Sequence, residues 1–216
     1  MYDIILWDLD GTLTDSQPGI YNSIYHALDK LGYPHPDSKH MKKFIGPPLL
    51  ESFDRYCGMD EETARKALEG YREYYNVKGY LENSVYPQVP EALEALKNAE
   101  KRLSVATSKP ENFARRICDH FGLSKYFEFI GGASLDEVRN NKIQVIEYVL
   151  GELQVTDKSK VLMVGDRRHD AEGAEINGID CMGVLYGYGD REELEDAGAK
   201  YIAATPLEAA NIIIAC

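Results

Sequence analysis

The chain runs early through Ile4-Ile5-Leu6-Trp7-Asp8-Leu9-Asp10-Gly11-Thr12, and this stretch decides the fold. Four apolar residues that end in spaced carboxylates and a Gly-Thr turn predict a parallel strand, buried on both faces, with acids at its tip. Because side chains alternate along a strand, Asp8 and Asp10 would share a face if the strand extended that far. Neighbouring carboxylates repel each other unless a cation or a proton separates them, and phosphoryl-transfer chemistry uses both.

The length and composition are those of a globular protein. The 216 residues suffice for one sizeable α/β domain or a core with a smaller insert, and the hydrophobic content is 44%. No apolar run approaches the roughly 18 residues of a membrane span, and the first run is too short for a signal peptide. We therefore expect a cytoplasmic protein without a membrane partner. Four cysteines without CxxC spacing predict reduced, separately placed thiols.

The net charge narrows the choice of partner. A formal charge of -12 argues against a nucleic acid polymer. It is compatible with a small anionic substrate, since a metal ion and one or two lysines make a local positive pocket in an acidic protein. The expected partner is a small phosphorylated metabolite or nucleotide, and the expected assembly is a monomer or a weak homodimer.

Residues 16–84 differ in pattern from the rest of the chain. They carry apolar side chains at helical spacing, as in the stripe from Ile20 to Leu31 that Gly32 closes, and they contain no β-branched runs. This pattern predicts an inserted helical cap domain at residues 16–84, with further helices that start near Asp37 and Asp60.

Residues 1–15 and 85–216 alternate between strand and helix patterns. Strands are expected at residues 103–107, 127–130, 161–164 and 182–185, and helices at 90–99, 111–121, 142–153, 171–177 and from 207. Repeated β-α units predict an α/β catalytic core at residues 1–15 and 85–216. We expect a Rossmann-like parallel sheet with helices on both faces and an active site at the carboxyl ends of the strands.

Polar and charged side chains stand at the ends of three expected strands and at the start of one expected helix. They are Asp8, Asp10, Thr107, Ser108, Lys142, Asp166 and Asp170. Oxygen ligands suit a hard divalent cation, so these residues predict a Mg²⁺ site with Asp8 and Asp166 as direct ligands. A hydroxyl and an ammonium, from Thr107 and Lys142, would orient the phosphate and neutralise its remaining oxygens.

Four motifs, in this order, resemble those of the haloacid dehalogenase superfamily. They are DLDGT at residues 8–12, VATSKP at 105–110, NNKIQVIEYVL at 140–150 and GDRRHD at 165–170. The resemblance spans the whole chain, and the insert is similar to that superfamily's first-type helical cap. FIGPPL at 44–49 and GVLYGYG at 183–189 resemble the phosphoglycolate phosphatase-like branch, especially its 5′-nucleotidase-like members.

The resemblance implies roles for individual residues. Asp8 looks like the nucleophile and Asp10 like the general acid and base. Asp166 looks like a metal ligand, and Asp170 looks like a second acid at or near the ion. The family also implies that Asp10 contributes to the metal site through its backbone carbonyl.

The function expected from these residues is a Mg²⁺-dependent phosphatase for small phosphate monoesters that works through an aspartyl-phosphate intermediate. Phosphoglycolate phosphatase-like activity is one candidate specificity, and 5′-nucleotidase activity is the alternative. Two other kinds of protein have similar core residues. One is a phosphoacceptor signalling domain, which the late GDRRHD motif and the large insert oppose, and the other is a phosphosugar mutase whose cap retains the intermediate.

Simpler interpretations are open for three of the residues near these strand ends. Asp170 is as well suited to cap a helix that begins at Ala171 as to act near a metal. Ser108 and Lys109 either bind phosphate or form the turn before the helix that follows Pro110.

Overall fold

The computed structural model describes residues 1–47, 49–136 and 138–216. Pro48, which belongs to the motif at residues 44–49, lies outside the described residues. The chain divides into two compact units, which we call the core unit (Met1–Asp15 with Val85–Cys216) and the inserted unit (Ser16–Ser84). Two short strands, β2 (Thr14–Asp15) and β3 (Ser84–Val85), pair with each other where the chain passes between the units.

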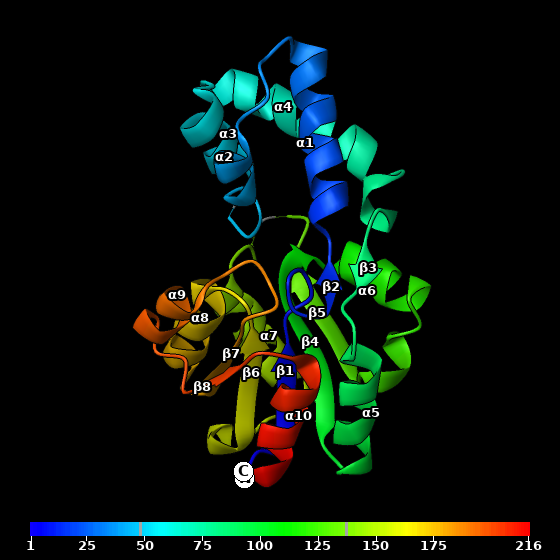
Figure 1. Cartoon of the computed structure of the whole chain (residues 1–216), viewed down its shortest axis with the longest axis vertical. Coiled ribbons are helices and arrows are strands. Elements are labelled where there is room, and N and C mark those ends of the chain that lie inside the picture. Colours follow the sequence, from blue (N-terminus) through cyan, green and yellow to red (C-terminus); the bar gives the residue numbers. More distant parts are fainter. Residues whose placement is uncertain (48, 137) are drawn as a thin grey trace. The chain divides into compact units, whose positions relative to one another are not determined.

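A six-stranded sheet forms the centre of the core unit (Figure 1). In spatial order its strands are β5 (Phe129–Ala133), β4 (Arg102–Pro110), β1 (Ile4–Trp7), β6 (Val161–Gly165), β7 (Asp180–Val184) and β8 (Tyr201–Ala203). All neighbouring strands in this sheet are parallel. Strand β1 lies in the interior, and the order of the chain reverses there. Such a reversal opens a crevice at the carboxyl ends of the strands, where ligands bind in open α/β sheets.

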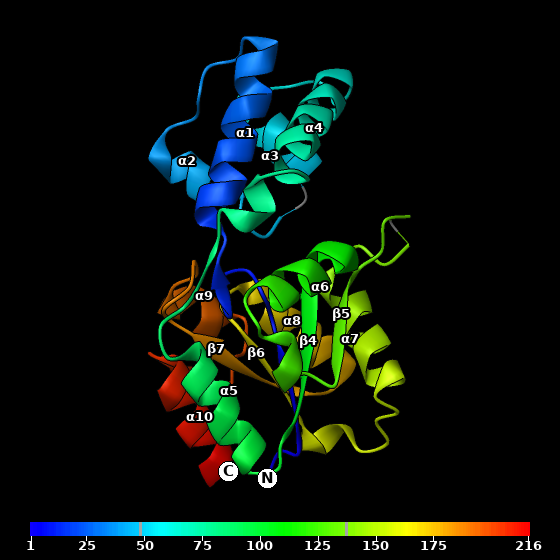
Figure 2. The ribbon, with the colours of Figure 1, turned by 90° about the vertical axis from the view of Figure 1, so that its right-hand side faces the viewer.

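Helices lie on both faces of this sheet (Figures 1 and 2). They are α5 (Val89–Asn98), α6 (Glu111–His120), α7 (Lys142–Glu152), α8 (Arg168–Asn177), α9 (Arg191–Asp196) and α10 (Pro206–Ala215), with short 3-10 turns η2 (Ser124–Tyr126) and η3 (Lys158–Lys160). Helix α7 packs against α8, and α5 packs against α10. The predicted α/β class, a parallel sheet between layers of helices, is confirmed.

Strand β1 is covered on both faces, as its apolar run predicts. All of its residues are buried. Ile4 and Leu6 belong to one hydrophobic cluster with side chains of α7 and α8, among them Val145. Because side chains alternate, Ile5 and Trp7 point to the other face. Packing on both faces holds β1 in place, and it therefore also fixes the position of Asp8, the residue that follows the strand.

Strand β5 differs from the prediction. The predicted strand ends at residue 130, before Gly131 and Gly132, yet β5 spans Phe129–Ala133 and contains both glycines. A Cβ atom at Gly131 would lie 2.4 Å from Cγ2 of Val149, so the glycine lets α7 pack close to the sheet. Here glycine marks a close approach of backbone and helix, where the sequence pattern indicated a strand end.

Helix α9 and strand β8 do not appear among the predicted elements. Both are short, at six and three residues, and α9 is mostly charged. Asp190 starts α9 by accepting a hydrogen bond from the Glu193 N–H at 2.9 Å. Elements of this length carry too few apolar positions for a period to be recognised.

The inserted unit consists of helices. They are α1 (Gln17–Leu31), α2 (Ser38–Lys42), α3 (Leu49–Cys57), α4 (Glu61–Tyr75) and the 3-10 turn η1 (Gly79–Leu81). Gly32 ends α1 in the left-handed conformation, with a φ of 70°. The carboxylate of Asp60 caps α4 by accepting a hydrogen bond from the Thr63 N–H at 2.8 Å.

Among the described residues, none of the helices is both long and apolar enough to cross a membrane. The four cysteines, Cys57, Cys118, Cys181 and Cys216, are all free.

Candidate active site

Three strands bring the predicted site residues to one edge of the sheet. The register pairs Trp7 of β1 with Val105 of β4 and with Val164 of β6, so the residues that follow these three positions lie at similar depth in the sheet. Asp8 follows β1 directly, and its N–H donates to the Val164 carbonyl at 2.9 Å. Asp166 follows the end of β6. The carboxyl ends of parallel strands therefore gather residues that are far apart in sequence.

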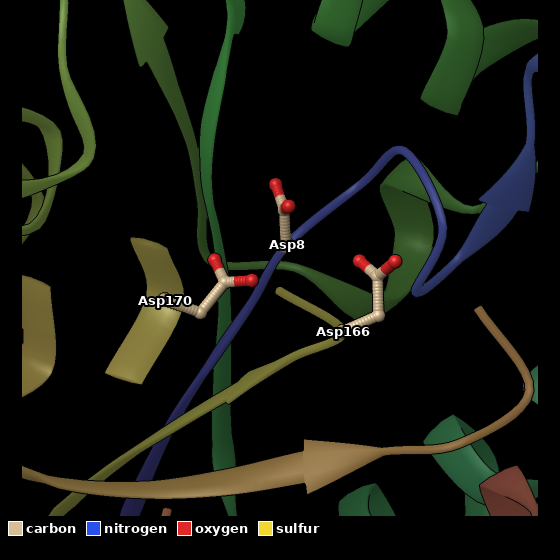
Figure 3. Close-up of side chains that lie close together, drawn as sticks. All are labelled: Asp8, Asp166 and Asp170. Carbon is tan, nitrogen blue, oxygen red and sulfur yellow. The ribbon is translucent and has the colours of Figure 1, made fainter. Parts of the chain in front are cut away.

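The carboxylates of Asp8, Asp166 and Asp170 form a buried cluster. One oxygen from each lies within 4.8 Å of the others. Figure 3 shows Asp8 at the end of β1, Asp166 at the end of β6 and Asp170 on the neighbouring helix. Burial, with added repulsion from Asp170 and Asp8, raises the pKa of Asp166 to about 8. Buried carboxylates that lie this close repel one another, and a divalent cation bound between them would offset that repulsion.

Lys142 supplies a positive charge beside this cluster. It begins α7, directly after Asn141, whose side chain caps the helix by accepting from the Gln144 N–H. Its Nζ atom lies 2.8 Å from Asp8 Oδ1 and 2.7 Å from Asp170 Oδ1. Burial alone would lower the pKa of Lys142, but the two carboxylates raise it well above its usual value, so the ammonium stays charged.

The carboxylate of Asp8 responds to the same neighbours. Burial raises its pKa to about 6, partly offset by the charge of Lys142, while Asp170 adds repulsion. Hydrogen bonds from the side chains of Lys142 and Thr107 also favour the ionised form. Asp8 Oδ1 accepts a further hydrogen bond, at 2.8 Å, from the N–H of Leu9. The nearby donors therefore hold the Asp8 carboxylate in one orientation.

Two loops hold Asp166 in place. The Thr12 hydroxyl donates to its Oδ1 atom at 3.1 Å, and the Tyr188 N–H donates to Oδ2 at 2.8 Å. Gly11 has a φ of 84°, and a Cβ atom there would lie 2.3 Å from Asp166 Oδ2. Glycine is thus required at this turn both for its conformation and for its small size.

Of the two interpretations that the sequence left open for Asp170, the helix cap is confirmed, and a role near a metal ion stays a prediction. Helix α8 begins at Arg168, so the expected start at Ala171 is wrong and Asp170 lies inside the first turn. Its Oδ2 atom accepts from the Arg167 N–H at 3.1 Å and caps the helix. Its Oδ1 atom pairs with Lys142. The helix starts early because this carboxylate satisfies a backbone N–H that otherwise has no partner within the helix.

The side chain of Asp10 is engaged outside the carboxylate cluster. Its Oδ2 atom lies 2.6 Å from Nζ of Lys109, a lysine whose side chain is only 5% exposed. The expectation that Asp10 contributes to a metal site through its backbone carbonyl stays a prediction.

Strand β4 extends further than expected and carries three polar residues. It continues to Pro110, so of the two interpretations of Ser108 and Lys109 the turn is wrong, and phosphate binding stays a prediction. Its register with β5 shifts between Ala106 and Pro110, which is a bulge of the kind that redirects side chains. The Thr107 hydroxyl accepts from the Lys109 N–H at 3.2 Å, and Ser108 between them is half-buried.

The contact of Lys109 with Asp10 is the feature of the site that the sequence analysis missed. Lys109 stands two residues after Thr107, the spacing of side chains on one face of a strand, and this was the available signal. The two interpretations open for Lys109, phosphate binding and a turn before the helix, did not include a contact with Asp10.

Comparison with known proteins gives one family. A family model described as haloacid dehalogenase-like hydrolase matches residues 5–184. A solved structure of a predicted phosphatase from Clostridium acetobutylicum has a TM-score of 0.93 and 42% identity, and the alignment covers 100% of both chains.

Three curated relatives carry different names. A 5′-nucleotidase from Pseudomonas aeruginosa is 46% identical over 89% of this chain and 87% of its own length. The tyrosine-protein kinase PtkA of Mycobacterium tuberculosis is 42% identical over 92% of this chain and 67% of its own. A phosphoglycolate phosphatase from Vibrio parahaemolyticus is 29% identical over 97% and 95%.

Proposed function

The chain belongs to the haloacid dehalogenase-like hydrolase family and is an enzyme of its phosphatase kind, and we propose that it hydrolyses small phosphate monoesters with Mg²⁺ through an aspartyl phosphate on Asp8. The observation that carries the proposal is the buried cluster of Asp8, Asp166 and Asp170 with Lys142 against it. A chain that only folds gains little from burying three carboxylates together, because such charges are costly without a cation or a partner.

The donor set fits Mg²⁺. Hard oxygen ligands of high charge are what this ion prefers, and the three carboxylates offer them within 4.8 Å of one another. Asp8 and Asp166 would hold the ion, with the backbone carbonyl of Asp10 as a third ligand and Asp170 at or near it. When bound, Mg²⁺ neutralises charge on the phosphoryl group and on the attacking carboxylate.

The first chemical step belongs to Asp8 and Asp10. A carboxylate oxygen of Asp8 attacks phosphorus, a bond forms between them, and the ester P–O bond breaks. Asp10 gives its proton to the departing alkoxide oxygen. Lys142 and Thr107, with Ser108 beside them, orient the phosphate through hydrogen bonds to its other oxygens.

The second step regenerates the enzyme. Asp10, now ionised, takes a proton from water, whose oxygen attacks phosphorus and displaces the carboxylate of Asp8. Inorganic phosphate leaves, and both aspartates return to their starting states. A single residue serves as acid and then as base, a role that typically contributes about 10²–10⁴ to the rate.

The inserted unit is the proposed cap, which admits the substrate and excludes water. Nucleoside 5′-monophosphates are the first substrates to test, because the relative named 5′-nucleotidase shares 46% of aligned residues with this chain. Phosphoglycolate is the second, supported by the relative at 29%. We place the enzyme in the cytoplasm, a proposal with which four free thiols agree, and we propose that it is a monomer or weak homodimer.

A second candidate follows from the relative named as a tyrosine-protein kinase, which is 42% identical. In this case a tyrosine hydroxyl, in place of water, would receive the phosphoryl group. Incubation with radiolabelled ATP and a tyrosine-containing polymer tests it: labelled polymer supports transfer, whereas label in free phosphate alone supports hydrolysis.

The proposed hydrolysis is tested by phosphate release from nucleoside 5′-monophosphates, phosphoglycolate and sugar phosphates, with Mg²⁺ or with EDTA. We expect release with Mg²⁺, none with EDTA and none from the Asp8→Asn variant. Asp180→Asn is the matched control, because Asp180 begins β7, at the amino end of the strand, and pairs with Lys200 at 2.8 Å. Release that is insensitive to EDTA, or an active Asp8→Asn variant, contradicts the mechanism.

A further inference from the structure

Lys109 is a buried lysine at the carboxyl end of the sheet that the proposed mechanism does not use. Its side chain is 5% exposed, and its Nζ atom lies 2.6 Å from Oδ2 of Asp10. Its own N–H donates to the Thr107 hydroxyl at 3.2 Å. One residue is thus bonded to two side chains that the proposed function places at the reacting phosphate.

The bulge in β4 brings about this arrangement. Between Ala106 and Pro110 the strand has more residues than its partner β5 opposes, so the register shifts. Extra residues in one strand bend it locally and re-aim its side chains. Thr107 and Lys109 both lie in the bulged segment, and both side chains are engaged with residues of the site.

The two oxygens of Asp10 are in different situations. Oδ2 is anchored by Lys109, whereas Oδ1 is buried and, within the part of the chain that the structure describes, has no hydrogen-bond partner. A buried acceptor without a partner is costly in a residue that serves stability alone. One anchored oxygen and one oxygen without a partner are the arrangement that a carboxylate needs if Oδ1 exchanges a proton with the substrate while Oδ2 holds the group in position.

We propose that Lys109 is a positioning residue, which fixes the Asp10 carboxylate through Oδ2 so that Oδ1 meets the leaving-group oxygen and then the attacking water. This inference rests on the proposed function, in which Asp10 is the acid and base. A buried ion pair is weak evidence for stability, since an apolar pair of similar volume often stabilises as well. Orientation of a reacting group is the benefit that a lysine, and no apolar residue, provides here.

The experiment compares two substrates that differ in their need for an acid. The oxygen of an alkyl monoester leaves only when it is protonated, whereas p-nitrophenolate leaves readily without a proton. In Lys109→Met we expect kcat for an alkyl phosphate to fall about 100-fold, with KM nearly unchanged, since small misplacements of reacting groups cost about this much. The loss with p-nitrophenyl phosphate, measured as formation of the phosphoenzyme, is expected to be at least about tenfold smaller.

Lys101→Met is the matched control. Lys101 is also buried, but it directly precedes β4, at the opposite end of the strand from Lys109, and its Nζ atom donates to the Tyr2 carbonyl at 2.6 Å. Its loss removes a buried lysine without touching Asp10. We expect unchanged kcat on both substrates.

The double variant Lys109→Met with Asp10→Asn separates positioning from direct contact with phosphate. If Lys109 acts through Asp10, its replacement costs nothing further once Asp10 is gone. A full additional loss in the double variant, or equal losses on the two substrates in the single variant, overturns the inference. If Lys109→Met does not fold, Lys109→Arg is used, which keeps the positive charge but places it at a different distance from Asp10. For this variant, too, we expect a larger loss of kcat with the alkyl phosphate than with p-nitrophenyl phosphate. Failure of the unaltered enzyme on both substrates would instead refute the proposed function.

Discussion

Replacement of Lys142 by methionine tests the electrostatic design of the site most directly. Methionine keeps much of the volume but removes an ammonium that lies 2.8 Å from Asp8, 2.7 Å from Asp170 and 3.0 Å from the Ala106 carbonyl. Breaking a buried ion pair by removal of one partner typically costs about 3–5 kcal/mol. Because about 2–4 °C of melting temperature corresponds to each kcal/mol in chains of this size, we expect the metal-free protein to melt about 6–20 °C lower.

Added Mg²⁺ should recover more of the melting temperature in this variant than in the unaltered protein. Without the ammonium the cluster carries one more uncompensated negative charge, so it attracts a cation more strongly. Activity should nevertheless stay low, because the proposed mechanism uses Lys142 to orient the phosphate. The variant therefore separates metal binding, which improves, from catalysis, which is lost.

The assay is thermal melting followed by tryptophan fluorescence, with EDTA and then with increasing Mg²⁺. Trp7 is the single tryptophan, it is fully buried, and it directly precedes Asp8. Lys101→Met serves as control, because it removes a buried lysine that bonds a backbone carbonyl and should leave the Mg²⁺ response unchanged. The reasoning would be refuted if metal-free Lys142→Met melted at the same temperature as the unaltered protein. It would also be refuted if Mg²⁺ raised the melting temperature of the variant no more than that of the unaltered protein.

Three further predictions concern pH, the glycine turn and the inserted unit. Because burial raises the pKa of Asp166 to about 8 and that of Asp8 to about 6, the folded metal-free protein binds protons more tightly than the unfolded chain, so its stability falls as pH rises from about 4 to about 8. Melting with and without Mg²⁺ should show a metal-induced rise that grows over this range, and a rise independent of pH would contradict it. Gly11→Ala should abolish Mg²⁺ binding in a fluorescence titration, since its Cβ atom would overlap Asp166, and normal binding would show that the turn relaxes. Asp60→Ala removes the cap of α4 and should lower the free energy of unfolding by about 1 kcal/mol in urea titration while kcat is unchanged; a loss of activity would mean that the inserted unit does more than close over the substrate.

The main elements of the core unit could be predicted because their signals are local. Strand β1 is a run of four apolar residues, and its burial on both faces follows from that run alone. Helix α7 starts at the expected Lys142, where Asn141 provides the cap. The short elements α9 and β8 give no comparable signal, because six and three residues carry too few apolar positions for a period to be recognised.

The boundaries that were wrong share a physical cause. Helix α8 begins three residues earlier than expected because the carboxylate of Asp170 caps it, and β4 runs on to Pro110 through a bulge. Strand β5 contains Gly131 because α7 packs close above it. In each case a contact made in the folded chain outweighs the ordinary preference of the residue at the expected boundary.

The sequence by itself predicted which chemical groups stand at this edge of the sheet, because acids, a hydroxyl and a lysine stand at the ends of elements that local patterns define. Only the tertiary structure decided how they pair. Lys142 bridges Asp8 and Asp170, while Lys109 pairs with Asp10. The reason is that pairing depends on strand order, register and a bulge, which bring residues about a hundred positions apart within hydrogen-bond distance, and no local pattern carries that information.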